Sequence, residues 1–438
     1  MHKKAVSLAV FAFGVLFAGQ SLAATDKAEL LRQEAKNWNV VIALIDAAVA
    51  DHMSVYGYHK KTTPNLERLA KETVVFENAF APAPYTISSM GSFFTGLYPH
   101  HHGSNDLGPK LGADVVTLGQ VVKTAGLPTF GFTGNRLGGS LGGYDKGFDR
   151  FVEFQGLKLT TSDKCQPMIL NWLDSERPSG RFFLFVHYVP PHTPYDPPAP
   201  FKGTFSTGYT GPIDPNGPNV LGDIDHGKLK VSPADLLHIA DCYDDNMLYA
   251  DYLVGQLMDK LRQLKLWDNT LFILIADHGE AFGEHGRMLH NSTVYDEMSH
   301  VPLMVHFPTK LVKPRRTSAL ICSAADMLPT LADVLRVSDA PRNIDGLSWL
   351  PVIVGKVKEI RSDVLLRSIS NKPTWALRTK QFKYLYEAET GGRELYDMRA
   401  DPKEKKNILA DKPDVAQKMH KRMEELVGTS LPITEPPK

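Results

Sequence analysis

The chain has 438 residues, of which 43% are hydrophobic and 22% are charged, and this is sufficient for one large folded core with a smaller appendage. Lysine and arginine together number 49, as do aspartate and glutamate, and no block of like charge stands out along the chain. This balance excludes a nucleic-acid-binding tail and a polybasic membrane-binding segment.

The first 23 residues have the pattern of an export signal. Residues 2–4 are basic, residues 5–18 are apolar, and Ser21-Leu22-Ala23 fits a small-x-small cleavage site. The alternative is an uncleaved anchor, because the apolar stretch approaches the length that spans a bilayer. Glycine and polar residues near its end favour cleavage. We expect a periplasmic or secreted chain that keeps no stable membrane span after cleavage.

Two unbroken apolar runs, residues 40–45 and 271–276, each end at an acid. A run without polar alternation is typical of a strand that is buried on both faces of a parallel sheet. The first run leads to Asp46, and the second leads to Asp277 and His278. Because the crevice of an open α/β sheet lies past the carboxyl ends of its strands, we expect these side chains to face the same crevice.

The alternation of strands and helices predicts a doubly wound, mostly parallel sheet flanked by helices. A long surface excursion, rich in proline, glycine and aspartate, is expected between about residues 197 and 233. The other predicted elements are strands at 74–76, 126–132 and 182–188 and helices at 63–70, 86–94 and 241–264.

After about residue 361 the pattern changes to short alternating strands joined by turns. Strands at 375–378, 382–386 and 393–397, followed by a helix at 413–426, predict a small α+β subdomain. We therefore predict three parts. These are a signal peptide at 1–23, an α/β catalytic domain at 24–360 and a C-terminal subdomain at 361–438.

Several short motifs occur together in an order and spacing that resemble the sulfatase family, within the alkaline-phosphatase-like superfamily. The resemblance covers nearly the whole chain after the signal segment. It implies a sulfatase-like α/β fold and chemistry on anionic esters, but a fold alone does not settle the activity. The motifs are Ile45-Asp46, Thr63-Pro64-Asn65-Leu66, Phe76-Glu77-Asn78-Ala79, Thr95-Gly96-Leu97-Tyr98-Pro99-His100, Pro191-His192-Thr193-Pro194, Asp277-His278-Gly279-Glu280, Tyr295-Asp296-Glu297, Val301-Pro302-Leu303 and Glu394-Leu395-Tyr396-Asp397.

The expected nucleophile position departs from the family pattern. Sulfatases carry Cys-x-Pro-Ser-Arg, or a serine variant, before the Thr-Gly pair, and the first residue is oxidised to formylglycine. Counting back from Thr95-Gly96 places Thr86 at that position and Met90 at the arginine. Threonine cannot become the aldehyde whose hydrate expels sulfate by elimination. A phosphorylated threonine can be attacked at phosphorus by activated water, which favours phosphate over sulfate chemistry.

Two alternatives to this assignment of Thr86 remain. Thr86 stands at the expected start of a helix, so it is also a possible capping residue. Ser88 and Ser89 are rival nucleophiles, although the count from the Thr-Gly pair disfavours them.

The resemblance implies one divalent metal ion held by Asp46, Thr86, Asp277 and His278. This set matches alkaline-phosphatase-like phosphodiesterases and headgroup transferases with a threonine nucleophile, and Ala47 stands where sulfatases usually carry a second aspartate. One nitrogen and mixed carboxylates favour manganese or zinc, with calcium as the alternative. The structural alternative for Asp277 and His278 is a helix cap and a core histidine.

The remaining candidates concern the substrate. His192 matches the sulfatase histidine on the leaving-group side, so we predict a general acid or substrate ligand there. Asn135 lies where many sulfatases carry an essential lysine, and it is a candidate for substrate binding. His192, Asp196 and His290 are candidates for holding a second ion. We expect His187 to support the residues of the site or to have a structural role.

The predicted function is an exported, metal-dependent hydrolase of phosphate mono- or diesters that works through a phosphothreonine intermediate. Its substrate would be a small-molecule or envelope-derived anionic ester. One alternative is a sulfuric ester hydrolase, and another is a phosphoryl or headgroup transferase, although such transferases usually carry several membrane helices. A third is a catalytically silent, sulfatase-like binding protein, against which the retention of Asp46, Asp277 and His278 argues.

Overall fold

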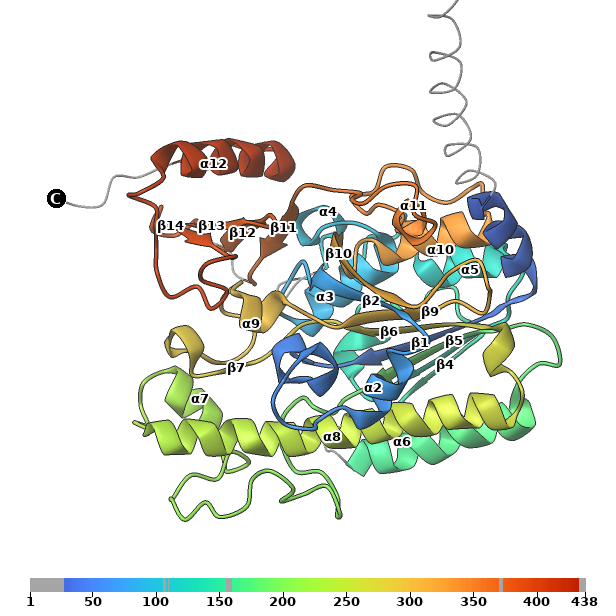
Figure 1. The fold of residues 1–438 in the computed structure, drawn as a ribbon, viewed down its shortest axis with the longest axis horizontal. Helices are drawn as coiled ribbons and strands as arrows, with labels where there is room; N and C mark the ends of the chain where they lie inside the picture. Colours follow the sequence, from blue (N-terminus) through green and yellow to red (C-terminus); the bar gives the residue numbers. More distant parts are fainter. Residues whose placement is uncertain (1–26, 105–107, 109, 155–159, 370–372, 433–438) are drawn as a thin grey trace, which may run out of the picture.

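The computed structural model describes residues 27–104, 108, 110–154, 160–369 and 373–432, and the predicted signal segment lies outside this range. Figure 1 shows a central sheet between two layers of helices, with a second, smaller sheet beside it. The central sheet has eight strands in the order β10-β2-β9-β6-β1-β5-β3-β4. Adjacent strands of this sheet run parallel to each other, with the exception of β9, which is antiparallel to β2 and β6. The predicted α/β fold is confirmed.

The central strands are buried along their whole length, as the unbroken apolar runs predict. Every residue of β1 and β6 is buried, and alternate residues of β1 pack into different cores on the two faces of the sheet. The strands of this sheet are β1 (Asn39–Ile45), β2 (Val74–Phe80), β3 (Thr129–Thr133), β4 (Arg150–Glu153), β5 (Phe183–Tyr188), β6 (Thr270–Ala276), β9 (Leu303–His306) and β10 (Arg315–Cys322).

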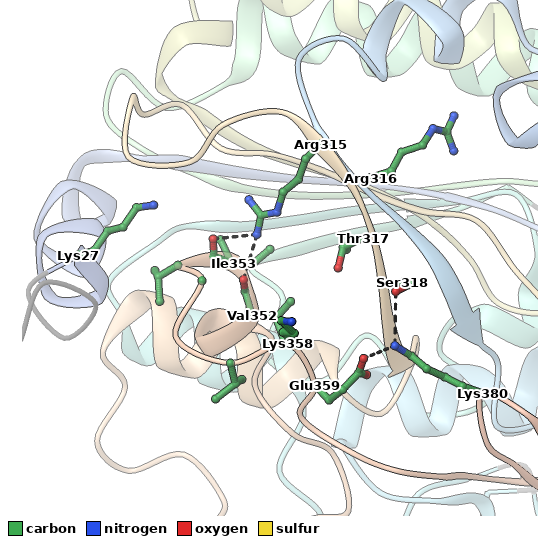
Figure 2. Close-up of a pocket in the computed structure, with 13 residues that line it drawn as sticks. Lys27, Arg315, Arg316, Thr317, Ser318, Val352, Ile353, Lys358, Glu359 and Lys380 are labelled. Atoms are coloured by element: carbon green, nitrogen blue, oxygen red, sulfur yellow. Dashed lines mark hydrogen bonds and ion pairs between the residues drawn. The ribbon is translucent and has the colours of Figure 1, made fainter. Parts of the chain in front are cut away.

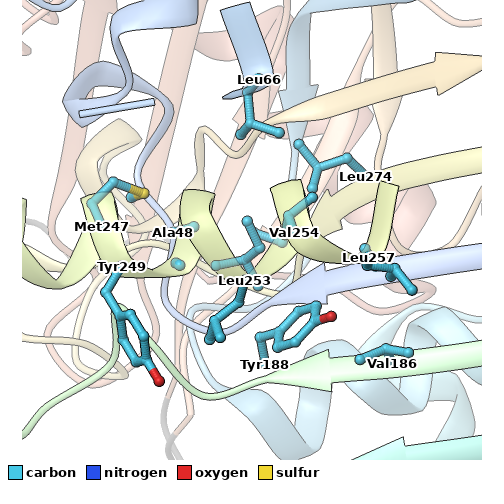
Figure 3. Packing of buried hydrophobic residues seen from close by; sticks show 14 of the residues in the cluster. Ala48, Leu66, Val186, Tyr188, Met247, Tyr249, Leu253, Val254, Leu257 and Leu274 are labelled. Atoms are coloured by element: carbon cyan, nitrogen blue, oxygen red, sulfur yellow. The ribbon is translucent and has the colours of Figure 1, made fainter. Parts of the chain in front are cut away.

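Helices cover both faces of the sheet (Figure 1). One face carries α2 (Pro64–Leu69), α6 (Thr160–Asn171) and α8 (Pro233–Gln263). Figure 3 shows side chains of α2 and α8 packed beside side chains of β5 and β6. The other carries α3 (Thr86–Thr95), α4 (Pro99–His102), α5 (Leu118–Thr124), α10 (Met327–Leu335) and α11 (Leu350–Ile353). Three short elements, β7 (Ala281–Phe282), β8 (Met288–Leu289) and α7 (Val220–Asp225), lie near the amino-terminal half of α8.

Helix α8 begins eight residues earlier than the predicted start at 241. Ser232 caps it by accepting a hydrogen bond from the Asp235 backbone, Asp235 reciprocates, and Pro233 occupies the first helical position. This capping box combined with an N1 proline is a strong helix start. The apolar periodicity used for the prediction begins only further along, where the helix meets the core.

The second sheet is antiparallel, in the order β11-β12-β13-β14. Met419 and Met423 of α12 (Pro413–Val427) belong to the same apolar core as this sheet. The strands are β11 (Val364–Arg367), β12 (Thr374–Arg378), β13 (Phe382–Glu387) and β14 (Arg393–Asp397). Strand β11 was not anticipated, and the boundary at 361 stays a prediction. Helix α9 (Asp296–Ser299) lies between the two sheets (Figure 1), and none of the described helices is long and apolar enough to cross a membrane.

Candidate active site

Two buried aspartates lie side by side at the carboxyl ends of the two central strands. Strands β1 and β6 pair in register, with Ile45 opposite Ala276, so Asp46 and Asp277 leave the sheet at the same level. Oδ1 of Asp277 accepts hydrogen bonds from the backbone N–H of Ala47 (3.2 Å) and of His278 (2.9 Å). The sheet itself therefore fixes the first two predicted ligands, which are at most 1% exposed.

Thr86 is the first residue of α3, and its hydroxyl faces the aspartates. Its Oγ1 lies 3.2 Å from Nε2 of His278 and 3.5 Å from Nδ2 of Asn135. The same Asn135 amide donates to Oδ2 of Asp46 at 2.6 Å. The structure thus brings Asp46, Thr86, Asn135, Asp277 and His278 into one buried cluster, while their individual roles stay predictions.

His187 joins this cluster, although the sequence analysis gave it a supporting or structural role. Its Nε2 lies 3.3 Å from Oδ2 of Asp46, and ligand atoms of Asp46, His187 and Asp277 all lie within 4.8 Å of one another. In the sequence His187 is only a polar residue near the end of an apolar run, and the pairing of β5 with β1, which places it opposite Leu44, is what brings it to this edge of the sheet.

The two histidines present lone pairs, not protons, to the aspartates. The Thr133 hydroxyl donates to the Asn135 carbonyl (2.9 Å), so it accepts from Nδ1–H of His187 (3.0 Å). Nδ1 of His278 lies 2.9 Å from the Gly279 carbonyl, which can only accept. In the neutral rings, both Nε2 atoms are therefore free to act as ligands.

Three buried polar atoms at the centre of this cluster have no hydrogen-bond partner among the residues that the structure describes: Oδ1 of Asp46, Oδ2 of Asp277 and Nε2 of His187. Nε2 of His278 points at the same place, 3.6 Å from Asp46 and 3.5 Å from Asp277. Buried polar atoms are rarely left unpaired, and two carboxylates facing two imidazole lone pairs repel one another without a cation. The donor set fits a divalent metal ion.

The pKa values of the two aspartates are shifted in opposite directions by their surroundings. For Asp46 burial acts to raise the pKa, but His192, His187 and His278 together hold it well below its usual range. For Asp277 burial and then the neighbouring charge of Asp46 raise the pKa. Within the described residues, neither carboxylate is bonded to lysine or arginine, and the neighbouring histidines oppose the carboxylate charge only when they are protonated.

His192 and His290, which are both partly exposed, extend the cluster. The ring of His290 lies 4.4 Å from that of His278 and 5.0 Å from that of His192, centroid to centroid. Nδ1–H of His290 donates to buried Glu280 (2.8 Å), and Nδ1–H of His192 donates to the Thr193 carbonyl (2.7 Å). Nε2 of each ring is thus left for a substrate or proton transfer.

Asn246 of α8 holds the loop that carries His192. Its Nδ2 lies 3.0 Å from the carbonyl of Pro191, 3.2 Å from that of His192 and 3.3 Å from that of Pro194. Asn246 is fully buried in the middle of the helix. A side chain that the sequence analysis did not single out therefore positions the candidate general acid.

Asp196 does not join the site. Its carboxylate is 51% exposed and pairs with Lys202 at 2.5 Å. Among the described residues, its ligand atoms do not gather with those of His192 and His290 into a metal-binding group. The geometry therefore gives no support to a second ion held by these three residues.

Comparisons with known proteins agree with this fold and site. The family model described as Sulfatase matches residues 38–337, and the model described as the C-terminal part of N-sulphoglucosamine sulphohydrolase matches residues 283–429. The chain belongs to the sulfatase family, and it is a hydrolase of the alkaline-phosphatase superfamily. The buried group of Asp46, His187 and Asp277 has the composition to hold a metal, as is typical of sulfatases.

Among curated proteins, the chain is 24% identical to an arylsulfatase of Clostridium perfringens, over 85% of this chain and 90% of that protein. It is also 24% identical to an N-acetylglucosamine-6-O-sulfatase of Bacteroides thetaiotaomicron, over 91% and 87%. A solved structure of similar fold is the phosphonate monoester hydrolase of Agrobacterium radiobacter, with a TM-score of 0.76, 20% identity and coverage of 89% and 95%. Most of the named relatives are sulfatases, so these comparisons support the alternative of sulfuric ester hydrolysis better than the predicted phosphate ester hydrolysis.

Proposed function

We propose that this chain hydrolyses phosphate mono- or diesters with Thr86 as the nucleophile. The observation that carries the proposal is the contact of the Thr86 hydroxyl with His278 (3.2 Å), at the start of a helix and beside two buried carboxylates. A metal ion held by Asp46, His187, Asp277 and His278 would lower the pKa of the hydroxyl and neutralise negative charge. The missing aldehyde precursor at this position supports phosphate rather than sulfate chemistry.

The side chains present have a place in each step of this reaction. The Thr86 hydroxyl gives its proton to water as its oxygen forms a bond to phosphorus and the bond to the leaving oxygen breaks, and the backbone N–H groups at the start of α3 bind the transferring oxyanion. His192, in the form that is protonated at both ring nitrogens, gives its Nε2 proton to the leaving oxygen. Water then attacks phosphorus and gives a proton to His192, and the bond to Thr86 breaks to release phosphate. The Thr86 oxygen takes a proton back from water, which restores the hydroxyl.

The finer parts of the proposal concern substrate, metal and compartment. The substrate is a small-molecule or envelope-derived anionic ester. Met90 and Asn135 stand where sulfatases carry cations, so fewer positive side chains would bind its anionic group. Manganese or zinc fits a set with histidine nitrogens better than calcium does. The pattern of residues 1–23 supports a periplasmic or secreted location.

A sulfuric ester hydrolase is the second candidate, and the family model over residues 38–337 together with the named relatives favours it. For such an enzyme, a sulfated Thr86 has no elimination route, so water would have to cleave it directly. The two candidate functions therefore differ in the substrate and in the group, phosphate or sulfate, that Thr86 would carry in the intermediate.

The test is a comparison of a 4-nitrophenyl phosphodiester, a 4-nitrophenyl phosphate and a 4-nitrophenyl sulfate, each with added manganese or zinc. Phosphoester turnover should exceed sulfate turnover by about a hundredfold or more, a difference of nearly 3 kcal/mol in barrier. Mass spectrometry should find Thr86 unmodified. Strong arylsulfatase activity with an intact Thr86 would contradict the phosphate proposal, and no turnover of any ester would favour a silent binding protein.

A further inference from the structure

A basic pocket of about 480 Å³ opens at the free edge of the large sheet (Figure 2). Its lining comes from the helix at 27–34, the start of β10, the segment after α11 and the turn between β12 and β13. Strand β10 is the outermost strand, and it pairs in parallel with β2 from Arg315 opposite Val74. The pocket therefore lies near the amino end of β10, whereas the candidate active site lies past the carboxyl ends of β1 and β6. The charged residues that line it are Lys27, Arg315, Arg316, Lys358, Glu359 and Lys380.

Two of these cations are matched by acids. Lys380 pairs with Glu359, the single carboxylate in the lining, and also lies 3.4 Å from the Ser318 hydroxyl. Arg316 extends away from the other cations in Figure 2 and approaches Glu77 at 3.8 Å. These pairs account for every acid within reach of the pocket's cations in the described part of the chain.

Three cations have no such match. Nη2 of Arg315 donates to the carbonyls of Val352 and Ile353, each at 3.0 Å, so the guanidinium is fixed by neutral groups. Burial lowers the pKa of Arg315, as expected for a guanidinium without a carboxylate partner. Neither Lys27 nor Lys358 makes a hydrogen bond or ion pair with any described residue. In a chain whose acids and bases are equal in number, this is a local excess of positive charge.

We propose that the basic pocket binds an oxyanion, the phosphate or sulfate group of a ligand, at a site separate from the candidate active site. The rigid Arg315 supplies an oriented planar donor, while Lys27 and Lys358 supply adjustable point charges around it. Cations on an edge strand also discourage pairing with other sheets, and this is the competing explanation of the cluster. The proposal does not depend on which ester the active site hydrolyses.

The test uses the full chain, the double variant Lys27→Ala/Lys358→Ala and the control Lys356→Ala. Lys356 is exposed and close in sequence but does not line the pocket. Isothermal titration with inorganic phosphate and with inorganic sulfate measures the free anions. Cosedimentation with vesicles of phosphatidylglycerol and phosphatidylcholine, against phosphatidylcholine alone, measures a lipid headgroup.

Binding to at least one of these probes should weaken about tenfold or more in the double variant, remain in Lys356→Ala and fall with added salt. Pocket-dependent vesicle binding would identify the ligand as a lipid phosphate, and pocket-dependent binding of the free ions alone would identify a soluble anion. Equal binding by all three proteins, or no binding by any, would overturn the proposal. Ester turnover should be unchanged in the double variant. Anion binding therefore tests the pocket and ester turnover tests the proposed function, so each can fail without the other.

Discussion

Two clusters of buried charge, one at the active site and one between the two sheets, balance their acids in different ways. Between the sheets, Lys383 lies 2.7 Å from Asp296 and 2.9 Å from Glu404, and Arg378 lies 3.3 Å from Asp296. Two acids there face two cations of the chain. At the active site, Asp46 and Asp277 face only histidines whose lone pairs point inward.

The difference shows where the chain itself provides the charge that opposes its buried acids and where it does not. A buried acid is costly unless it is paired, so a cluster that is complete in itself contributes to folding and a cluster that is incomplete is suited to a ligand. The charge cluster between the sheets, which we call the joint, is complete in itself, whereas the cluster at the active site is incomplete. Substitutions at each should therefore fail in different ways.

The largest effect is expected from Asp277→Ala. This change removes one of the two carboxylates, so bound manganese or zinc should fall below about a tenth of an ion per chain, and turnover should be lost with it. The metal-free protein should keep its fold, because a repulsive buried charge has been removed. Metal analysis and thermal unfolding in a chelator check both parts. Asp196→Ala, a surface acid, should keep a full metal content, and equal metal content in the two variants would contradict the assignment.

The next effect separates the nucleophile from the charge cluster. Thr86→Ala should reduce turnover by about 10⁴-fold or more while metal content and substrate binding remain measurable. Thr86→Ser should keep part of the activity, because a primary alkoxide can attack from nearly the same place. Steady-state kinetics with a 4-nitrophenyl phosphodiester measure both. Equal rates in wild type and Thr86→Ala would show that another group is the nucleophile.

In the joint between the sheets, Lys383→Met should lower the free energy of unfolding by about 3–5 kcal/mol, because it leaves Glu404 and Asp296 buried with too little positive charge. Denaturant unfolding measures this loss, and the exposed Lys405→Met serves as its control. Metal content should be unchanged in both variants. A loss below about 1 kcal/mol would mean that the two clusters are not as different as their geometry indicates.

The smallest effect is a pH dependence in the same joint. Burial raises the pKa of Glu404 to about 7 from its usual 4.5, with Lys383 opposing and Asp296 adding to the shift. A folded-state pKa above the unfolded one gives stability that is complete below about pH 4.5 and is lost as pH rises through about 7. Unfolding measured from pH 5 to pH 8 should show this decline in wild type and not in Glu404→Gln. The same slope in both proteins would assign the titration to another group.

The parts of the site that follow directly from strand ends could be predicted from the sequence. Asp46 and Asp277 each terminate an unbroken apolar run, and Thr86 follows by counting from Thr95-Gly96. His187 could not be predicted because it lies within an apolar run, and only the pairing of β5 with β1 shows that it reaches the same edge. The side-chain direction of Asp196 could not be predicted, because the spacing of residues in a loop does not determine where a side chain points. Its carboxylate turns outward to Lys202 instead of towards His192 and His290.

The fold was predictable for similar reasons. Long buried strands and the periodic core face of α8 are visible in the sequence, whereas β11 is a short apolar run that only its partner β12 identifies as a strand. The start of α8 was misplaced because it depends on the Ser232 cap rather than on apolar periodicity.

The register of β1 and β6 also bears on the order in which this molecule is assembled. Asp46 and Asp277 are far apart in the chain, and they meet only after the central strands have paired over their full length. Before these strands pair, the group that could hold a metal ion is not assembled, and a slip of the register by a single residue would turn one aspartate away from the other. An ion that binds this group would therefore enter a site that folding has already built, and the metals available where the chain folds, as much as ligand chemistry, would decide which ion fills it.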